Sequence, residues 1–111
     1  MDGYYEKKDL ADFANIGEHA PEHAKRFFDY YKAATAGGKL SEREKALIAL
    51  TVSLTQNCPY CIDAYTTKCL SLGITAEEMA EASHVGAAMM AGITLAHSTQ
   101  MRKIIKAGRK G

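Results

Sequence analysis

Two cysteines give this chain its clearest capacity for chemistry, in the sequence Cys58-Pro59-Tyr60-Cys61. The sequence follows an apolar segment and reads as the start of a helix, with Pro59 on the first turn. Thiols three residues apart on that turn can form a reversible disulfide. The unpaired N–H groups of a helix N-terminus also favour a thiolate over a thiol. The spacing therefore predicts a redox-active dithiol.

Two other uses of such a pair are open. The cysteines could be small buried hydrophobic residues, or they could bind zinc, which takes four ligands at recognisable spacings. The other candidate ligands, Cys69, His84 and His97, are scattered along the chain, and Pro21 separates His19 from His23. We therefore favour redox chemistry and predict no metal and no bound cofactor.

Which thiol attacks is also open at this point. Cys58 lies nearest the expected helix N-terminus, where a thiolate is most favoured. A deeper thiol assisted by a base would instead be Cys61, with Cys58 as the resolving partner that closes the disulfide. Spacing alone does not choose between the two assignments.

The elements that must position the thiols are all expected to be helices, because apolar residues recur at helical spacing and runs with a period of two are missing. Ser41 with Glu44, and Thr75 with Glu78, are spaced as capping boxes. We expect helices over 10–16, from Pro21 to the Gly37-Gly38 pair, over 41–56, 59–72 and from 76 onward, with a kink or break at Gly92 before a last helix through Lys106. The prediction is a compact all-α bundle of five to six helices.

Length and charge narrow the class of protein. With 111 residues the chain is long enough for a single domain over 1–111. Fourteen basic and 13 acidic side chains nearly cancel, so we expect neither nucleic acid nor a membrane surface as a partner. An odd number of cysteines and an N-terminus without an apolar signal-peptide core favour a cytoplasmic protein.

The C-terminal third carries a set of adaptable apolar side chains. These are Met79, Met89, Met90 and Met101, with Gly86, Ala87, Ala88 and Gly92 among them. Small residues let helices approach closely, and methionines fill irregular interfaces. We expect this surface to be buried against other copies of the chain.

At this point the sequence resembles a known family. The segment from Leu40 through Cys58-Pro59-Tyr60-Cys61 to Thr66, with the later 73–82 segment, is similar to the alkyl-hydroperoxidase D-like branch of the carboxymuconolactone decarboxylase family. The resemblance implies an all-α fold that assembles into trimers or hexamers. It also implies thiol-dependent reduction of hydroperoxides, with Cys61 reacting with the peroxide and Cys58 as the resolving thiol. Some similar proteins are associated with arsenosugar biosynthesis, although no residue here points to arsenic.

The chain departs from that family at the residues that activate the thiol. Family peroxidases carry a glutamate twelve residues before the first cysteine and a histidine four after the second, and these positions are Ala46 and Tyr65 here. Glu44 is two residues from Ala46, about 200° around a helix, so it does not substitute. Tyr65 can hydrogen-bond but is a weak base at neutral pH.

A different residue is needed as proton acceptor, and His84 is our candidate. A single His in apolar surroundings is more often a packed core residue, but the helix that carries His84 is expected to lie near the thiols. The predicted site is therefore Cys61, Cys58, His84 and Tyr65.

Three functions follow, in order of preference. The first is an enzyme, a thiol peroxidase that takes a hydroperoxide substrate and a dithiol or protein reductant. The second is a non-catalytic oligomeric redox sensor or protein-disulfide exchange module, favoured by the missing relay. A decarboxylase is the least favoured, because such family members generally lack this thiol pair.

Overall fold

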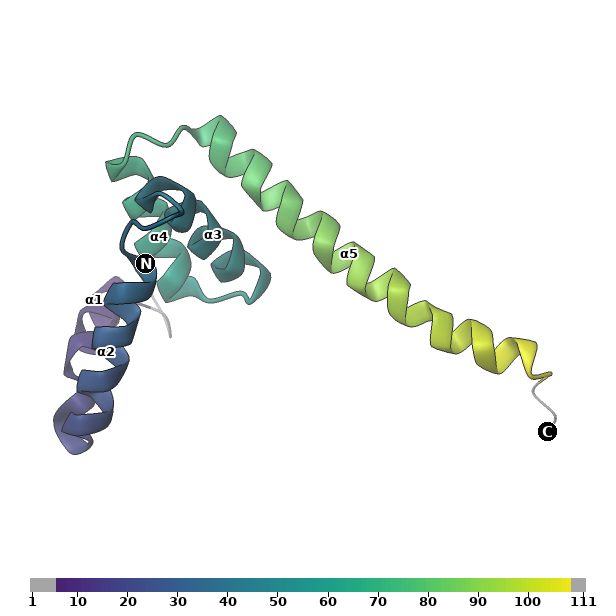
Figure 1. Cartoon of the computed structure of the whole chain (residues 1–111), viewed down its shortest axis with the longest axis horizontal. Helices are drawn as coiled ribbons and strands as arrows, with labels where there is room; N and C mark the ends of the chain where they lie inside the picture. The colour runs from purple at the N-terminus through teal and green to yellow at the C-terminus, as the bar shows by residue number, and fades with distance from the viewer. Residues whose placement is uncertain (1–5, 109–111) are drawn as a thin grey trace.

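The fold is built from helices alone throughout residues 6–108, the part of the chain that the computed structural model describes. In chain order the elements are α1 (Lys7–Leu10), the 3-10 helix η1 (Ala11–His19), α2 (Pro21–Thr35), α3 (Glu42–Thr55), α4 (Pro59–Ser71) and α5 (Ala76–Lys106). Figure 1 shows α1 and α2 at one end of the molecule, with α3 and α4 in the middle, and η1 packs against α2. The all-α prediction is confirmed for these residues.

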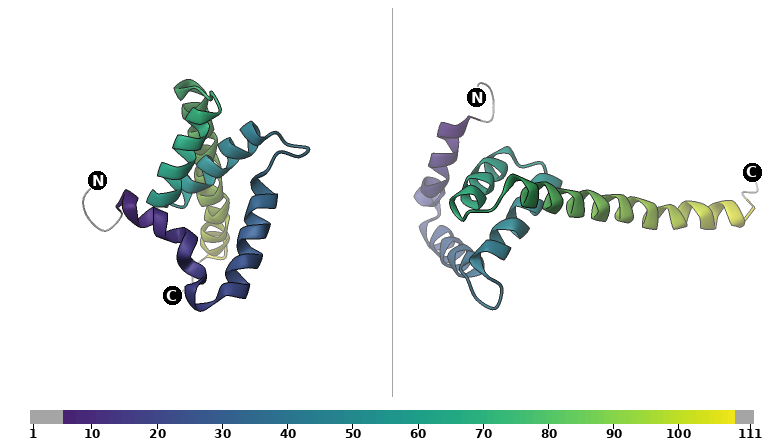
Figure 2. Two further views of the ribbon diagram at one scale, coloured as in Figure 1. Left: turned by 90° about the vertical axis from the view of Figure 1, so that its left-hand side faces the viewer. Right: turned by 90° about the horizontal axis from the view of Figure 1, so that it is seen from above.

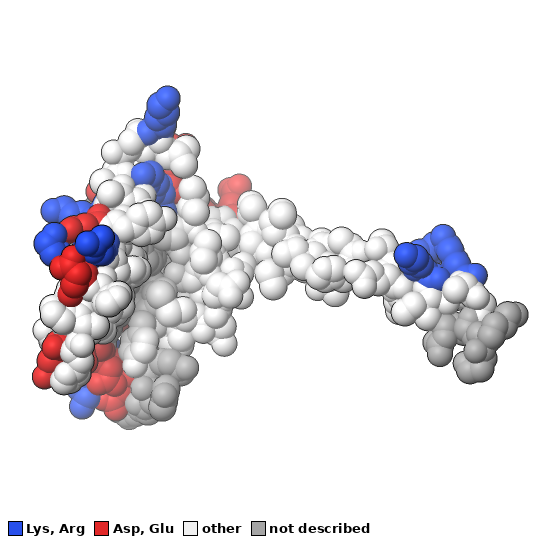
Figure 3. Space-filling model, turned by 60° about the horizontal axis from the view of Figure 1, so that its bottom comes forward, with Lys and Arg blue, Asp and Glu red and all other residues white. Residues whose placement is uncertain are grey.

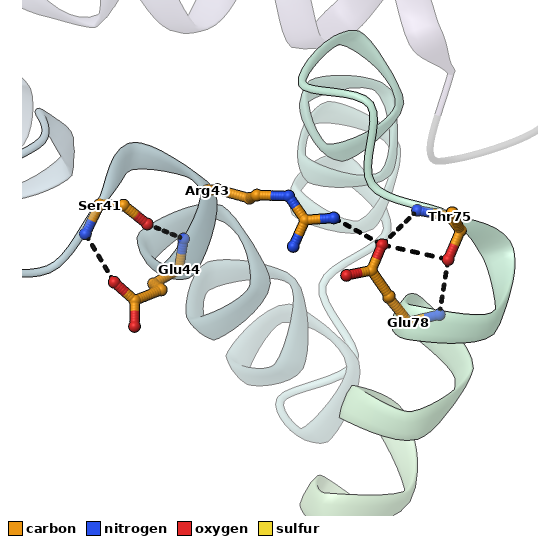
Figure 4. A network of polar contacts seen from close by, with 5 residues as sticks. All are labelled: Ser41, Arg43, Glu44, Thr75 and Glu78. Carbon is orange, nitrogen blue, oxygen red and sulfur yellow. Dashed lines mark hydrogen bonds and ion pairs between the residues drawn. The ribbon is translucent and has the colours of Figure 1, made fainter.

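Both predicted capping boxes are present. The Ser41 hydroxyl accepts a hydrogen bond from the Glu44 N–H, and the Glu44 carboxylate accepts one from the Ser41 N–H; Thr75 and Glu78 repeat this arrangement. Arg43 connects the two helix starts, because its guanidinium Nη2 lies 2.5 Å from Oε1 of Glu78 (Figure 4). The caps therefore fix where α3 and α5 begin and also help hold them together.

The expected break at Gly92 is wrong. α5 runs without interruption for 31 residues, from Ala76 to Lys106. One glycine inside a helix costs about 1 kcal/mol relative to alanine. The flanking Ala- and Met-rich sequence is helix-forming and contains no proline, so the backbone hydrogen bonds continue through this position.

The core lies where α3 meets α4 and α5. Its buried side chains are Ala46 and Leu50 of α3, Cys69 of α4 and Ile74 of the following turn. α3 packs against both other helices, which confirms its predicted central place and its contact with the thiol helix. α4 is thereby fixed on its inner side, with its first turn directed toward α1 and η1.

Beyond this core α5 extends away from the other helices (Figures 1 and 2). The radius of gyration is 19.2 Å, against about 13 Å for a compact domain of this length. From Ala82 to Met101 the helix carries no Lys, Arg, Asp or Glu. Figure 3 shows this part of α5 without charged residues and basic residues near its C-terminal end. Even so, no helix within residues 6–108 is both long and apolar enough to cross a membrane.

Candidate active site

The thiols lie where the chain turns from α3 into α4. Asn57 makes this turn with a φ of 52°, a left-handed conformation that Asn tolerates better than most residues. Cys58 follows as the N-cap of α4, and its Sγ accepts a hydrogen bond from the Cys61 N–H at 3.4 Å. Pro59 occupies the first turn, where no backbone donor is needed.

The two sulfur atoms are close together and partly exposed. Both cysteines are free, and their Sγ atoms lie 2.7 Å apart. A disulfide bond is about 2.05 Å long, so small side-chain movements would bring the atoms to bonding distance. The pair is therefore arranged to pass between dithiol and disulfide without a change of fold.

Their surroundings shift the two thiol pKa values in opposite directions. Hydrogen bonds from the Cys61 thiol and backbone N–H lower the pKa of Cys58 below its ordinary value. Burial and the interaction with Cys58 raise the pKa of Cys61 to about 11, against a smaller opposing effect of the Ser53 hydroxyl. Cys58 is therefore the thiol that ionises first.

The thiols open into a cavity of about 790 Å³. One wall is α4, and the opposite wall comes from α1, η1 and α2. The lining residues are Asp9, Leu10, Asp12, Phe13, Ile16, Tyr31, Cys58, Tyr60, Cys61, Ala64 and Tyr65. Apart from the thiols, two carboxylates and three tyrosine hydroxyls, the lining is apolar, so the cavity suits a molecule with a hydrocarbon part.

Two of the lining tyrosines contact each other. The hydroxyl groups of Tyr31 on α2 and Tyr65 on α4 are hydrogen-bonded to each other. The same pair also lines a second cavity of about 450 Å³ between α2, α3 and α4. Burial raises the pKa of Tyr65, so its hydroxyl keeps its proton at neutral pH.

The structure brings Tyr65 to the thiols but not His84. His84 is exposed and lines a different surface depression with Leu47 and Val85. The expectation that its helix lies near the thiol helix is not met within one chain, because α5 packs against α3. His97 is exposed further along α5. Within the described part of the chain, no three His, Cys, Asp or Glu side chains gather in a way that could hold a metal ion.

The two positions of the missing relay have different surroundings. Ala46 is 4% exposed and belongs to the core, so no charged group occupies that place. Glu44 is used in the capping box, as predicted. Tyr65 faces the thiol cavity, and its hydroxyl partner is Tyr31 rather than a residue of α3.

Several site residues were not identified from the sequence. No motif or spacing in the sequence marks Tyr31, Asp9, Asp12 or Phe13 as residues of the site. Only contacts between segments far apart in the chain bring them to the cavity. Ser53 lies in the last turn of α3, and its burial next to a thiol has no signature in the sequence.

A model of the carboxymuconolactone decarboxylase family matches residues 21–101, which is most of the chain. The chain belongs to this family. This family includes decarboxylases and peroxidase-like enzymes. The match agrees with the resemblance carried by the Cys58-Pro59-Tyr60-Cys61 segment. The match begins at α2, so α1 and η1 lie outside it.

Individual relatives agree with this assignment. The uncharacterized protein 4 in the cox locus of Paracoccus denitrificans is 34% identical over 79 residues, 71% of each chain. A crystal structure from Methanobacterium thermoautotrophicum is 36% identical with a TM-score of 0.72, over 76% of this chain and 94% of that one. A family member from Legionella pneumophila, solved in its apo form, is 27% identical with a TM-score of 0.69, over 94% of both chains.

Proposed function

We propose that the protein is a thiol-dependent hydroperoxide reductase in which Cys58 and Cys61 cycle between dithiol and disulfide. The observation that carries this proposal is the pair of free sulfur atoms, 2.7 Å apart, at the wall of a cavity large enough for a substrate. Membership of the carboxymuconolactone decarboxylase family is in keeping with it.

The chemistry has two steps. The Cys58 thiolate attacks the terminal oxygen of the hydroperoxide, so that an S–O bond forms, the O–O bond breaks and the leaving oxygen takes up a proton to become an alcohol. The Cys61 sulfur then attacks the Cys58 sulfenic acid, an S–S bond forms, and the Cys61 proton leaves with the hydroxyl group as water. An external dithiol, small or protein-borne, returns both cysteines to thiols.

The assignment of Cys58 as the attacking thiol reverses the roles that the resemblance implies. Those roles depend on a glutamate–histidine relay beside the second cysteine, and Ala46 and Tyr65 stand in its place. Without a base, ionisation is governed by the helix N-terminus and by hydrogen bonds, both of which favour Cys58.

The cavity supports an organic hydroperoxide as substrate. Leu10, Phe13 and Ile16 offer apolar contacts for an alkyl or aryl group, whereas hydrogen peroxide has no part that would use them. Thiols cycle most readily where reductants are abundant, so we place the reaction in the cytoplasm.

A second function is supported by the same difference between the two thiols, a lowered pKa of Cys58 and a raised pKa of Cys61. A low pKa on the first cysteine of such a pair is also the arrangement of protein-disulfide exchange. The alternative is therefore a redox sensor or exchange module without peroxidase turnover. A decarboxylase is less favoured, since that chemistry does not use a dithiol.

Hydroperoxide consumption with a dithiol reductant separates these functions. The wild type is compared with Cys58→Ser, Cys61→Ser and the double variant, using cumene hydroperoxide. We expect turnover by the wild type only. If the wild type is no faster than the double variant but still reduces a disulfide-bonded test protein, the exchange function replaces the peroxidase function.

A further inference from the structure

We infer that the hydrogen-bonded hydroxyl groups of Tyr31 and Tyr65 act as the general acid of this site, donating a proton to the alkoxide that leaves when the O–O bond breaks. This inference rests on the proposed peroxidase function. It assigns a catalytic role to Tyr31, which no feature of the sequence indicates.

The geometry places the hydroxyl pair and the thiols on one cavity. Tyr65 follows Cys61 by four residues and Cys58 by seven, so all three occupy one face of α4. Tyr31 reaches the same cavity from α2 and bonds to the Tyr65 hydroxyl. A hydroperoxide whose terminal oxygen meets a sulfur therefore has its other oxygen directed along a cavity that these hydroxyls line.

The chemistry of the lining favours the tyrosines as donors. Among the described residues that line this cavity there is no lysine, arginine or histidine, and the carboxyl groups are those of Asp9 and Asp12. Carboxylates at neutral pH accept protons rather than supply them. Burial raises the pKa of Tyr65, so this hydroxyl carries a proton at neutral pH, and the Tyr31–Tyr65 pair is partly buried and held in place by its own hydrogen bond. The Tyr60 hydroxyl also lines the cavity, so the test includes it.

The pair supplies the proton that the leaving oxygen needs. Attack by the Cys58 thiolate makes an S–O bond and expels an alkoxide. One hydroxyl of the pair gives its proton to that oxygen, which becomes the alcohol. The other hydroxyl donates a hydrogen bond to the new phenolate and stabilises it. The phenolate then regains a proton from water. Activation of the thiol itself requires no base, because Cys58 has a lowered pKa.

The test uses two substrates that differ in their need for a proton donor. Cumene hydroperoxide expels an alkoxide, a very strong base, whereas a peroxycarboxylic acid expels a carboxylate whose conjugate acid has a pKa near ~4. A general acid accelerates the first reaction much more than the second. We compare kcat/KM for both substrates in the wild type, Tyr31→Phe, Tyr65→Phe, Tyr60→Phe and Tyr30→Phe. Tyr30 is next to Tyr31 in the chain but 72% exposed and outside the cavity.

We expect Tyr31→Phe and Tyr65→Phe to lose about 100-fold in kcat/KM with cumene hydroperoxide, the lower end of the range for a general acid. Their activity with the peroxy acid should change less than about threefold, which also shows that the variants are folded and that their thiols react. Tyr30→Phe should match the wild type with both substrates.

The results distinguish a failure of the proposed peroxidase function from a failure of the general-acid inference. A wild type that is inactive with both substrates overturns the proposed peroxidase itself. If the wild type is active and kcat/KM of the Tyr31 and Tyr65 variants falls equally with both substrates, or does not fall with either, the hydroxyl pair is structural and the inference is wrong. A selective loss in Tyr60→Phe alone also overturns it and moves the donor to Tyr60.

Discussion

The two thiols differ because of what donates to each sulfur. The Cys58 Sγ accepts a hydrogen bond from the Cys61 N–H and lies 2.7 Å from the Cys61 Sγ. Cys61 is more deeply placed, and burial is the main cause of its raised pKa. Three residues of separation along a helix are therefore enough to make one cysteine the stronger acid.

Alkylation at limiting reagent tests this difference. We expect iodoacetamide to label Cys58 well before Cys61 near neutral pH, because only the thiolate reacts and Cys58 has the lowered pKa. In Cys61→Ala the pKa of Cys58 should rise, since its main hydrogen-bond donor is lost. Mass mapping across a pH series measures both effects. Cys69 is 0% exposed and should stay unlabelled in the folded protein. If Cys61 is labelled first, Cys61 becomes the attacking thiol and Cys58 the resolving thiol, as the resemblance implies.

The carboxylates of Asp9 and Asp12 should select among organic hydroperoxides by charge. A fatty-acid hydroperoxide brings a carboxylate that these groups repel, by about 1 kcal/mol per partly solvated contact. We expect Asp9→Asn with Asp12→Asn to raise kcat/KM for it roughly threefold to tenfold. The methyl ester of the same hydroperoxide should show no gain. Asp29→Asn, at an exposed position outside the cavity, is the control variant, and an equal gain there would argue against local charge selection.

Residue types near one another in the sequence were predictable and distant contacts were not. The Cys58–Cys61 pair follows from spacing on one helical turn. Tyr65 follows from its place one turn later. The Tyr31 hydroxyl reaches Tyr65 across 34 residues of chain, and His84 is kept from the thiols because α5 packs on α3. Neither outcome could be deduced without the packing of whole helices.

At the scale of elements, close approach decides how α5 packs on α3. A Cβ atom on Gly86 would lie 3.0 Å from Cγ2 of both Thr51 and Thr55, whereas one on Gly92 would meet nothing within 4 Å. The helix caps were predictable because they are local, and the unbroken course of α5 was not, because it depends on the sum of many small propensities.

Two glycine substitutions test this packing. Gly86→Ala should lower the free energy of unfolding by about 1–3 kcal/mol, because α3 and α5 must separate to admit the methyl group. Gly92→Ala should raise it by about 0.5–1 kcal/mol through better helix propensity. Urea denaturation measures both. A higher free energy of unfolding for Gly86→Ala would show that α3 and α5 have space for the added methyl group. A lower one for Gly92→Ala would indicate a close neighbour from another copy of the chain.

The ion pair between α3 and α5 should make stability depend on acidity. The Arg43 hydrogen bond lowers the pKa of Glu78 from 4.5 to about 2. A depressed carboxyl pKa stabilises the fold above the unfolded value, and this contribution is lost as the pH falls from 4.5 toward 2. Urea midpoints across that range should drop more for the wild type than for Glu78→Gln. Glu77→Gln, the neighbouring residue, should keep the full drop; equal slopes in all three proteins would exclude the ion pair as the cause.

The whole molecule presents far more apolar helix than one chain covers. Along the outer part of α5, Met89, Ile93, Met101 and Ile104 are exposed, and the segment from Ala82 to Met101 is uncharged. Exposed apolar surfaces of this kind mark interfaces. We propose that α5 packs against other copies of the chain, as a trimer, a hexamer or at least a dimer.

Sedimentation velocity at micromolar concentration tests the assembly. We expect the wild type to sediment as an oligomer and Ile93→Asp to shift it toward monomer, because a buried unpaired charge is strongly unfavourable. Thr99→Asp, on a face about 120° away around the helix, is the matched control and should leave the oligomer intact. A monomeric wild type would leave the extended α5 without a partner and contradict the proposal.

The cavity wall formed by α1 and η1 lies outside the segment that the family model matches. The thiols and the tyrosine pair lie within the segment that the family shares, residues 21–101, whereas Asp9, Asp12, Phe13 and Ile16 precede it. These two helices supply cavity wall but neither thiol nor the hydrogen-bonded tyrosine pair, so we expect their sequence to decide which hydroperoxide is accepted and not whether the thiols react. Relatives that keep the same dithiol but carry another segment ahead of α2 would accept different substrates, and exchanging that segment between them would exchange their preferences.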